Sequence, residues 1–187
     1  MALVRVQAER IDFAQAASTL PSDGSFGALV SFTGYCRDEA GRLAALEIEH
    51  YPGMAEGQIG KIAETVATRW PLAGWAIIHR FGMILPGEEI VFVACASQHR
   101  QAAFEAASCI MDFMKTEAPF WKSEEVDGEG RWVEACPADT TAAERWRRPV
   151  RRSTRHPVLS RAECASTAER TTPGADPPRV CQTHHTC

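Results

Sequence analysis

The chain has 187 residues and a hydrophobic content of 45%, which is enough to bury a core and excludes wholesale disorder. No apolar run approaches the roughly 20 residues of a membrane span, and the first residues lack the layout of a signal peptide, so we expect a cytoplasmic protein. The net charge of −4 is uneven, because residues 1–148 hold 14 Lys and Arg against 21 Asp and Glu. An acidic body argues against nucleic-acid binding and makes any basic cluster within it informative.

The seven cysteines give no indication of a metal or redox centre. No C-x-x-C pair is present, so neither a zinc ribbon nor a thioredoxin-like site is expected, and reduced thiols fit best. The segment Cys181–Cys187 contains His184 and His185 as well, but it has no preformed geometry, so adventitious metal binding is the expectation there.

In the first half of the chain, hydrophobic periodicity predicts the order strand, helix, strand, strand, helix. The elements are a strand at Leu3–Gln7, a short helix capped by Asp12, strands at Ala28–Thr33 and Leu43–His50, and a helix at Met54–Trp70. The strand at Ala28–Thr33 is predicted to be buried. The polar connection at residues 38–42 suggests that this strand and the next form a hairpin.

The second half predicts two strands, a long helix and a shorter strand–helix ending. The elements are strands at Trp75–Phe81 and Glu89–Ala96, a helix at Gln98–Thr116, an extended segment at Phe120–Lys122, a strand at Arg131–Ala135 and a helix at Thr140–Arg147. The almost wholly apolar run Ile90–Ala96 predicts a central strand. Ser97 is a good candidate for the N-cap of the long helix, and Pro119 forbids its continuation.

From Pro149 onward the composition changes. Residues 149–187 are rich in Pro, Arg and Thr and carry no apolar periodicity, which predicts a tail of low order after a domain that spans residues 1–148. The mixed helices and strands of that domain indicate the α+β class.

His99 and Arg100 follow the predicted central strand and begin a helix. A helix N-terminus offers unpaired N–H groups and a positive dipole end, so it binds phosphate readily. Two cationic residues at this end oppose the dipole, which makes sense if an anion lies between them. A solvated first turn with an incidental His–Arg pair is the alternative.

Lys115 and Lys122 are separated by the helix stop at Pro119, which could direct both ammonium groups towards one pocket. Close placement, together with apolar walls from Phe120 and Trp121, would lower the pKa of at least one lysine and yield an amine able to act as base or nucleophile. Taken without other information, surface charge is the more common explanation of such lysines.

Arg37 follows a strand and Gly34, where a loop can carry function, and its guanidinium suits phosphate. An exposed arginine paired with Asp38 or Glu39 is the alternative. Cys36, its neighbour, could serve sulfur relay only as a thiolate of low pKa.

The order and spacing of several segments resemble the large subunit of molybdopterin synthase, the MoaE family. These segments are F-T-G-Y-C-R, L-E-I-E-H-Y-P-G-M, I-I-H-R-F-G, P-G-E-E-I-V-F-V, S-Q-H-R-Q-A-A-F-E-A, M-D-F-M-K-T-E-A-P-F-W-K and R-W-V-E-A. The resemblance covers about residues 1–148 and leaves the tail outside the family pattern.

The resemblance implies an α/β-hammerhead fold, with an antiparallel or mixed sheet packed against helices. It implies a homodimer of large subunits within a heterotetramer, in which each large subunit binds a ubiquitin-like small subunit. The Gly-Gly C-terminus of that partner, carried as a thiocarboxylate, would donate sulfur to cyclic pyranopterin monophosphate and form the dithiolene of molybdopterin. This sulfurtransferase would need no metal or organic cofactor, and neither nucleic acid nor membrane is implied as a partner.

Carried onto this chain, the family pattern assigns Lys115 and Lys122 to catalysis, with Lys115 as the favoured residue. The residues assigned to substrate binding are Tyr35, Cys36, Arg37, His99, Arg100, Lys115, Lys122, Ser123 and Glu124, with His99 and Arg100 reaching the site across a dimer interface in one arrangement. Tyr35 and Glu117 depart from residues common in the family.

Three alternatives remain open at the level of sequence. One is a non-catalytic phosphate- or pterin-binding regulatory module with the same fold, although binding alone rarely requires a lysine pair. Another is a sulfurtransferase that uses Cys36. The third is a metal-binding protein organised by the tail, which predicts that deletion of residues 149–187 destroys function; we expect that truncation to leave near-normal activity.

Overall fold

The computed structural model describes residues 1–38, 41–126, 129–133 and 136–147, which form two four-stranded sheets and four helices. The first sheet has the strand order β1–β4–β6–β2, formed by β1 (Ala2–Gln7), β4 (Leu72–Arg80), β6 (Glu89–Ser97) and β2 (Ala28–Tyr35). β1 and β4 are parallel, whereas the other pairs are antiparallel. The predicted α+β class is confirmed.

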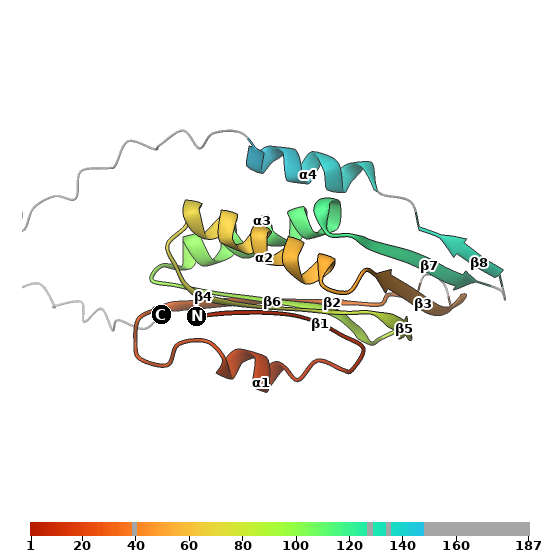
Figure 1. The fold of residues 1–187 in the computed structure, drawn as a ribbon, viewed down its shortest axis with the longest axis horizontal. Coiled ribbons are helices and arrows are strands. Elements are labelled where there is room, and N and C mark those ends of the chain that lie inside the picture. The colour runs from red at the N-terminus through yellow and green to blue at the C-terminus, as the bar shows by residue number, and fades with distance from the viewer. Residues whose placement is uncertain (39–40, 127–128, 134–135, 148–187) are drawn as a thin grey trace, which may run out of the picture. The chain divides into compact units, whose positions relative to one another are not determined.

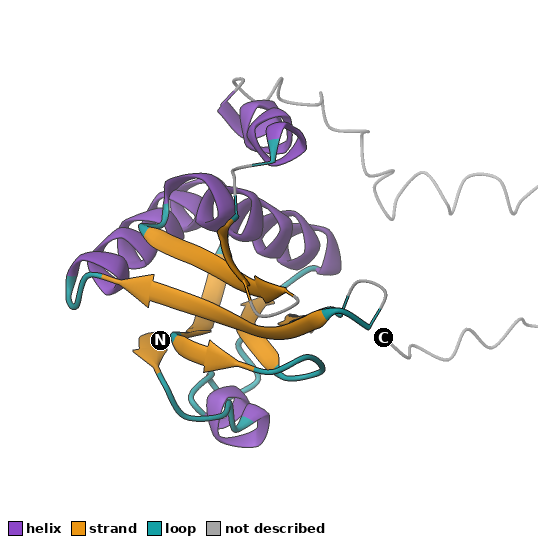
Figure 2. Cartoon of the chain, turned by 90° about the vertical axis from the view of Figure 1, so that its right-hand side faces the viewer, coloured by secondary structure: helices purple, strands orange, loops and turns teal. Residues whose placement is uncertain are grey.

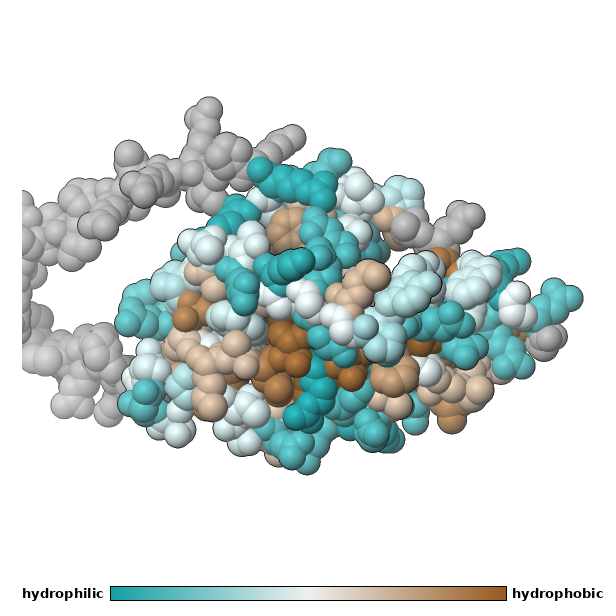
Figure 3. All heavy atoms as spheres, viewed as in Figure 1, coloured by the Kyte–Doolittle hydropathy of each residue, from teal (hydrophilic) through white to brown (hydrophobic). Residues whose placement is uncertain are grey.

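Helices cover both faces of the first sheet (Figures 1 and 2). On one face lie α2 (Met54–Arg69) and α3 (Arg100–Glu117), and on the other lies α1 (Phe13–Ser18). In Figure 3 the apolar side chains on the visible face gather in a band between α1 and α2, at the level of this sheet. β6 is in the interior of the sheet and almost entirely buried, as its apolar sequence predicted.

The second sheet is antiparallel and has the order β5–β3–β7–β8. Its strands are β5 (Gly82–Ile84), β3 (Leu43–His50), β7 (Phe120–Val126) and β8 (Glu129–Trp132). Phe81 alone separates β4 from β5, and Ala118 and Pro119 separate α3 from β7, so the two sheets are joined by very short connections. A small core of Cys36, Leu46, Ile48 and Ile84 fills this region. The last helix of the described residues, α4 (Pro137–Arg147), packs on α3 through ion pairs.

Three local predictions were wrong. β2 and β3 do not form a hairpin, because β2 pairs with β6 in the first sheet while β3 pairs with β5 and β7 in the second. β2 is not buried, because it is an edge strand with Leu29, Phe32 and Tyr35 exposed. Ser97 is not the N-cap of α3, because it ends β6 and its hydroxyl donates to the carbonyl of Pro71 at 2.9 Å.

A buried carboxylate joins three parts of the chain at the start of β6. Glu89 is 2% exposed and accepts hydrogen bonds from Arg10 Nε at 3.0 Å, Arg10 Nη2 at 2.7 Å and the backbone N–H of Ile11 at 2.9 Å. Arg80, also buried, donates to Glu88 and to the carbonyl of Glu89. The hydrogen bonds from Arg10, and then those from backbone N–H groups, lower the pKa of Glu89 to about 2.

We expect Glu89→Gln to lower the free energy of unfolding by about 3 kcal/mol at pH 7, because the buried charged group that accepts three hydrogen bonds is lost. The lowered pKa of Glu89 contributes stability that is complete above its ordinary value near 4.5 and is lost as the pH falls towards 2. The difference between variant and wild type should therefore shrink over that range in urea titrations. Exposed Glu64→Gln is the control; equal pH dependence in wild type and Glu89→Gln would contradict the assignment.

Candidate active site

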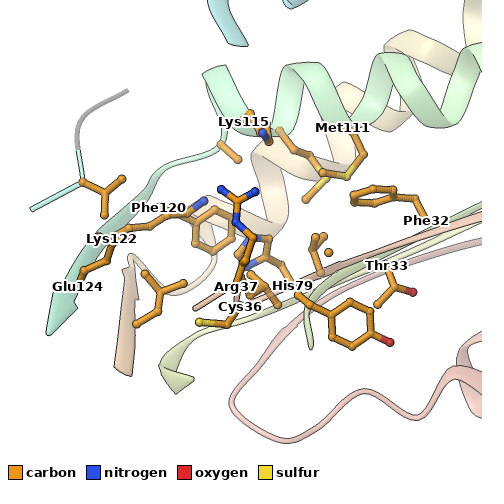
Figure 4. A pocket seen from close by; sticks show the side chains of 18 of the residues that line it. Phe32, Thr33, Cys36, Arg37, His79, Met111, Lys115, Phe120, Lys122 and Glu124 are labelled. Atoms are coloured by element: carbon orange, nitrogen blue, oxygen red, sulfur yellow. The ribbon is translucent and has the colours of Figure 1, made fainter. Parts of the chain in front are cut away.

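A cavity of about 620 Å³ lies where β2, β4, β7 and the end of α3 meet. Its lining combines cationic and apolar side chains from both sheets: Phe32, Thr33, Gly34, Tyr35, Cys36, Arg37, Leu43, Leu46, His79, Ile90, Val91, Met111, Met114, Lys115, Ala118, Phe120, Lys122, Glu124 and Val133. Figure 4 shows the nitrogen atoms of Arg37, Lys115 and Lys122 directed towards the same region, with Phe32 and Met111 on the other side. The cavity is thus cationic at one end and apolar at the other.

Two of the chain's three lysines line this cavity. Lys115 lies in the last turn of α3, and its Nζ is 3.1 Å from Oδ1 of Asp139 in α4. Lys122 lies in β7, which begins directly after Pro119 has ended the helix. The helix stop therefore brings both lysines to one cavity.

The surroundings of Lys122 favour its neutral amine. Burial lowers the pKa of Lys122, and the positive charge of Lys115 lowers it further, while Asp139 opposes the shift. The expectation that close placement would lower the pKa of one lysine of the pair agrees with this direction. Of the two expected apolar walls, Phe120 lines the cavity, whereas Trp121 does not line it and is 44% exposed. The family resemblance favoured Lys115 as the catalytic residue, and the lowered pKa is that of Lys122.

The end of β2 presents Tyr35, Cys36 and Arg37 to the cavity. Cys36 is fixed by its backbone, since its N–H donates to the carbonyl of Glu88 and its carbonyl accepts from Gly87, both at 2.8 Å. Burial raises the pKa of the Cys36 thiol, and the negative charges of Glu124 and Glu88 raise it further. A nucleophilic thiolate is therefore disfavoured at this position.

Alternation along β7 separates two residues that the sequence had grouped. Lys122 and Glu124 line the cavity, because residues two apart share a face of a strand. Ser123 does not line it; it borders a hollow of about 300 Å³ beside Glu47 and Met83.

His99 and Arg100 lie far from the other cations of the same chain. They start α3, whereas Lys115 ends it, and 15 residues of helix span about 22 Å. His99 is the N-cap residue but makes no side-chain capping bond, and the first turn holds no acidic residue. Within one chain, His99 and Arg100 therefore do not line the cavity that holds Arg37, Lys115 and Lys122, and their assignment to substrate binding stays a prediction that needs a dimer.

Sequence reasoning missed His79 and most of the apolar lining. His79 lies in the mostly apolar strand β4, where a lone histidine carries no spacing signal, yet it borders the cavity. Phe32, Met111 and Met114 looked like ordinary apolar positions of a strand and a helix. Their shared location depends on how β2 packs on α3, which no local pattern reveals.

A second hollow of about 620 Å³ adjoins the first and shares Arg37, Leu43 and Glu124 with it. Its further lining residues are Arg42, Val126, Glu129, Gly130, Arg131 and Trp132. The two hollows follow the same side of β7, from Lys122 through Glu124 to Val126, so they form one groove that leads to the lysines.

Comparison with known proteins gives the family. The model of the MoaE protein family matches residues 6–117. The chain belongs to the MoaE family. A family member from Mesorhizobium japonicum named molybdopterin synthase catalytic subunit is 56% identical over 147 residues, covering 77% of this chain and 92% of that protein. One from Escherichia coli with the same name is 49% identical over 122 residues, covering 64% of this chain and 81% of that protein.

A solved MoaE structure from Burkholderia ambifaria superimposes with a TM-score of 0.69 at 42% identity, covering 80% of this chain and all of that one. The α/β arrangement expected from the resemblance is thus the MoaE fold. Within the described ranges no helix has the length and apolar character to cross a bilayer, and no three His, Cys, Asp or Glu side chains are grouped to hold a metal ion. The tail at 149–187, with its Cys181–Cys187 segment, lies outside the described residues.

We expect Lys115→Met to raise the pKa of Lys122, because one of the two causes that lower it is removed while burial remains. The measurement is NMR titration of the Lys122 side chain in protein labelled at lysine. Lys61→Met is a matched control, since Lys61 is exposed on α2 and is the chain's only other lysine. An unchanged pKa of Lys122 in Lys115→Met would show that the two ammonium groups do not interact.

Proposed function

We propose that this chain is the catalytic subunit of a molybdopterin synthase. In this proposal a ubiquitin-like small subunit carries sulfur as a C-terminal Gly-Gly thiocarboxylate, and the chain directs its transfer to cyclic pyranopterin monophosphate to form the dithiolene. The observation that carries the proposal is the cavity in which Arg37 and Lys115 accompany Lys122, whose pKa is lowered. The names of the relatives, which describe a catalytic subunit of this enzyme, support it.

The two ends of the cavity suit the two parts of such a substrate. Arg37 and Lys115 supply charge for a phosphate, and the guanidinium adds bidentate geometry. Phe32, Met111 and Phe120 supply an apolar wall for a ring system. A ligand that is both planar and anionic satisfies both ends at once.

Lys122 is the residue we assign to proton transfer. A lowered pKa increases the fraction of neutral amine near pH 7, which a general base or nucleophile needs. In this assignment Lys115 is the cation that binds the substrate anion, and the anion replaces Asp139 as its ion-pair partner. The thiocarboxylate sulfur adds to an electrophilic carbonyl carbon of the substrate, whose C=O π electrons move to the oxygen. That oxygen takes up two protons and leaves as water while the neighbouring carbon loses a proton, which gives a C=C bond. A second water then cleaves the acyl–sulfur bond, so that the sulfur stays on the substrate and a carboxylate is left on the partner.

The groove formed by the two adjoining hollows gives the partner's C-terminus a route to the lysines. It runs beside β7 from the exposed strand β8 inward, and Arg37, Arg42 and Arg131 border it. An extended chain that ends in two glycines is narrow enough for such a groove, and a terminal anion is attracted by its arginines.

In a dimer, His99 and Arg100 of one subunit would lie near the cavity of the other subunit. Ala28 pairs with Ser97, so these two residues lie near the start of β2, whereas the cavity lies near its end at Tyr35. Antiparallel pairing of two β2 edges about a two-fold axis would place the start of one strand beside the end of the other. Arg100 of the partner subunit would then approach the mouth of the cavity, and the exposed Leu29 and Phe32 would be covered.

The rival functions differ in what the site must do. A non-catalytic pterin-binding module does not explain a half-buried lysine kept beside a second cation, which costs free energy that binding alone does not require. A cysteine-based transferase conflicts with the raised pKa of Cys36.

We expect Lys115→Ala and Lys122→Ala each to lower kcat/KM at least about 100-fold, because the first removes a cation that positions the substrate anion and the second removes the group assigned to proton transfer. Cys36→Ala should keep activity within a few-fold. The assay is reconstitution with a thiocarboxylated small subunit and cyclic pyranopterin monophosphate, with dithiolene product measured and Lys61→Ala as control. Pterin binding without any turnover by the wild type would instead support the regulatory module.

The dimeric site predicts complementation. Arg100→Ala and Lys122→Ala chains should each be weakly active alone, but a mixture that has been dissociated and reassociated should regain activity, because mixed dimers contain one intact site. A mixture of Lys115→Ala and Lys122→Ala chains is the control. Both lysines come from the same subunit of a site, so every site in a mixed dimer lacks one of them and no activity is regained. No gain in the first mixture would place Arg100 outside the active site.

A further inference from the structure

His79 is a buried, titratable side chain that the proposed mechanism leaves unused. It lies in β4, is 6% exposed and lines the cavity that holds the two lysines. Its ring stacks on that of Phe120, with the ring centroids 3.9 Å apart and an angle of 14° between the planes. Figure 4 shows the residue among the side chains that surround the cavity. The packing therefore fixes the ring in position and orientation.

The hydrogen bond at one ring nitrogen determines the state of the other. Nδ1 is 2.7 Å from the carbonyl oxygen of Arg80, and a carbonyl can only accept, so Nδ1 carries the proton. Burial lowers the pKa of His79 to about 3, and the positive charges of Lys122 and His50 act in the same direction. The ring is neutral at physiological pH, so Nε2 holds a lone pair.

The described residues give Nε2 no hydrogen-bond donor, although the ammonium of Lys122 is close enough to influence the ring electrostatically. A neutral acceptor at the wall of a cavity otherwise rich in donors has a specific use. Arg37, Lys115 and Lys122 can hold the anionic part of a ligand, but none of them can accept a hydrogen bond while charged. Glu124 can accept through its carboxylate, and the hydroxyls of Thr33 and Tyr35 can accept as well as donate. Nε2 of His79 differs from these in being a neutral side-chain atom that can only accept.

We propose that Nε2 of His79 accepts a hydrogen bond from a ring N–H of the bound substrate and so determines which heterocycle the cavity takes. This inference rests on the proposed function, since it identifies a contact to the pterin part of the same substrate. Stacking on Phe120 fixes the orientation of the His79 imidazole. Its Nε2 then favours a reduced pterin ring that carries N–H groups over an aromatic ring that lacks those hydrogens. His79 is thus a specificity-determining residue, while Lys115 binds the anion and Lys122 transfers the proton.

The test compares binding of two phosphate-bearing pterins, one tetrahydro and one fully oxidised, which has fewer ring N–H groups. Isothermal titration with wild-type protein should show the reduced ligand binding about ten-fold tighter, as expected when one buried hydrogen bond is lost. His79→Phe keeps an aromatic ring to stack on Phe120 but removes the acceptor, so it should bind both ligands with similar affinity. Equal preference in wild type and His79→Phe would overturn the proposal.

His50→Phe is the matched control. His50 belongs to the same aromatic cluster, with its ring 4.4 Å from Phe81 and 6.3 Å from Phe120, but it does not line the cavity. It should keep the wild-type preference for the reduced ligand. Loss of the preference in both variants would indicate a general packing effect and would also overturn the proposal.

A measurement on the wild type guards against a variant that fails to fold. In protein labelled with ¹⁵N-histidine, the Nε2 resonance of His79 should move towards the position of a hydrogen-bonded acceptor when the reduced pterin phosphate is added. It should not move with inorganic phosphate alone. Turnover with the thiocarboxylated partner tests the proposed function separately: an active enzyme whose Nε2 resonance does not respond would refute the role of His79 and leave the function intact.

Discussion

The junction between the two sheets depends on satisfying one buried carboxylate. Glu89 lies at the start of β6. Burying its carboxylate would cost free energy if Arg10 and Ile11 did not donate hydrogen bonds to it. The same corner holds Arg80 and the backbone pairing of Cys36 with its neighbours in the turn before β6. The end of β2 is fixed there, and with it the direction in which Arg37 enters the cavity. The site is therefore built on an ionic anchor rather than on apolar packing alone.

Much of the fold could be predicted from the sequence because its signals are local. The apolar run of β6, the periodic face of α2 and the stop at Pro119 each predicted an element that the structure contains. The pairing of strands was not local. β2 and β3 adjoin in sequence, yet they belong to different sheets, because β2 pairs with the central strand β6 and β3 pairs with β7, two strands that are distant in sequence. Short connections favour a hairpin only when no such partner competes.

The candidate site, like the fold, has some features that local sequence patterns predict and others that they do not. The lysine pair could be predicted because a helix stop and a strand lie within eight residues of each other. Ser123 could not be excluded until the face of β7 was known, and His99 and Arg100 satisfied every local criterion for anion binding while lying at the far end of α3. His79 shows the opposite case. Its chemistry comes from a carbonyl acceptor and a stacked ring contributed by other positions, which the printed sequence does not reveal.

The ion pair between Lys115 and Asp139 has a thermodynamic consequence. Helix α4 is held on α3 by Asp139, Arg145 and Arg147, so one of its three ion pairs uses the ammonium assigned to the substrate anion. An anion that binds Lys115 must compete with Asp139. By thermodynamic linkage, anion binding weakens the packing of α4 on α3 by the same free energy by which that packing weakens anion binding. If the ligand takes Lys115 as assigned above, occupancy of the cavity and the packing of α4 on α3 are coupled quantities.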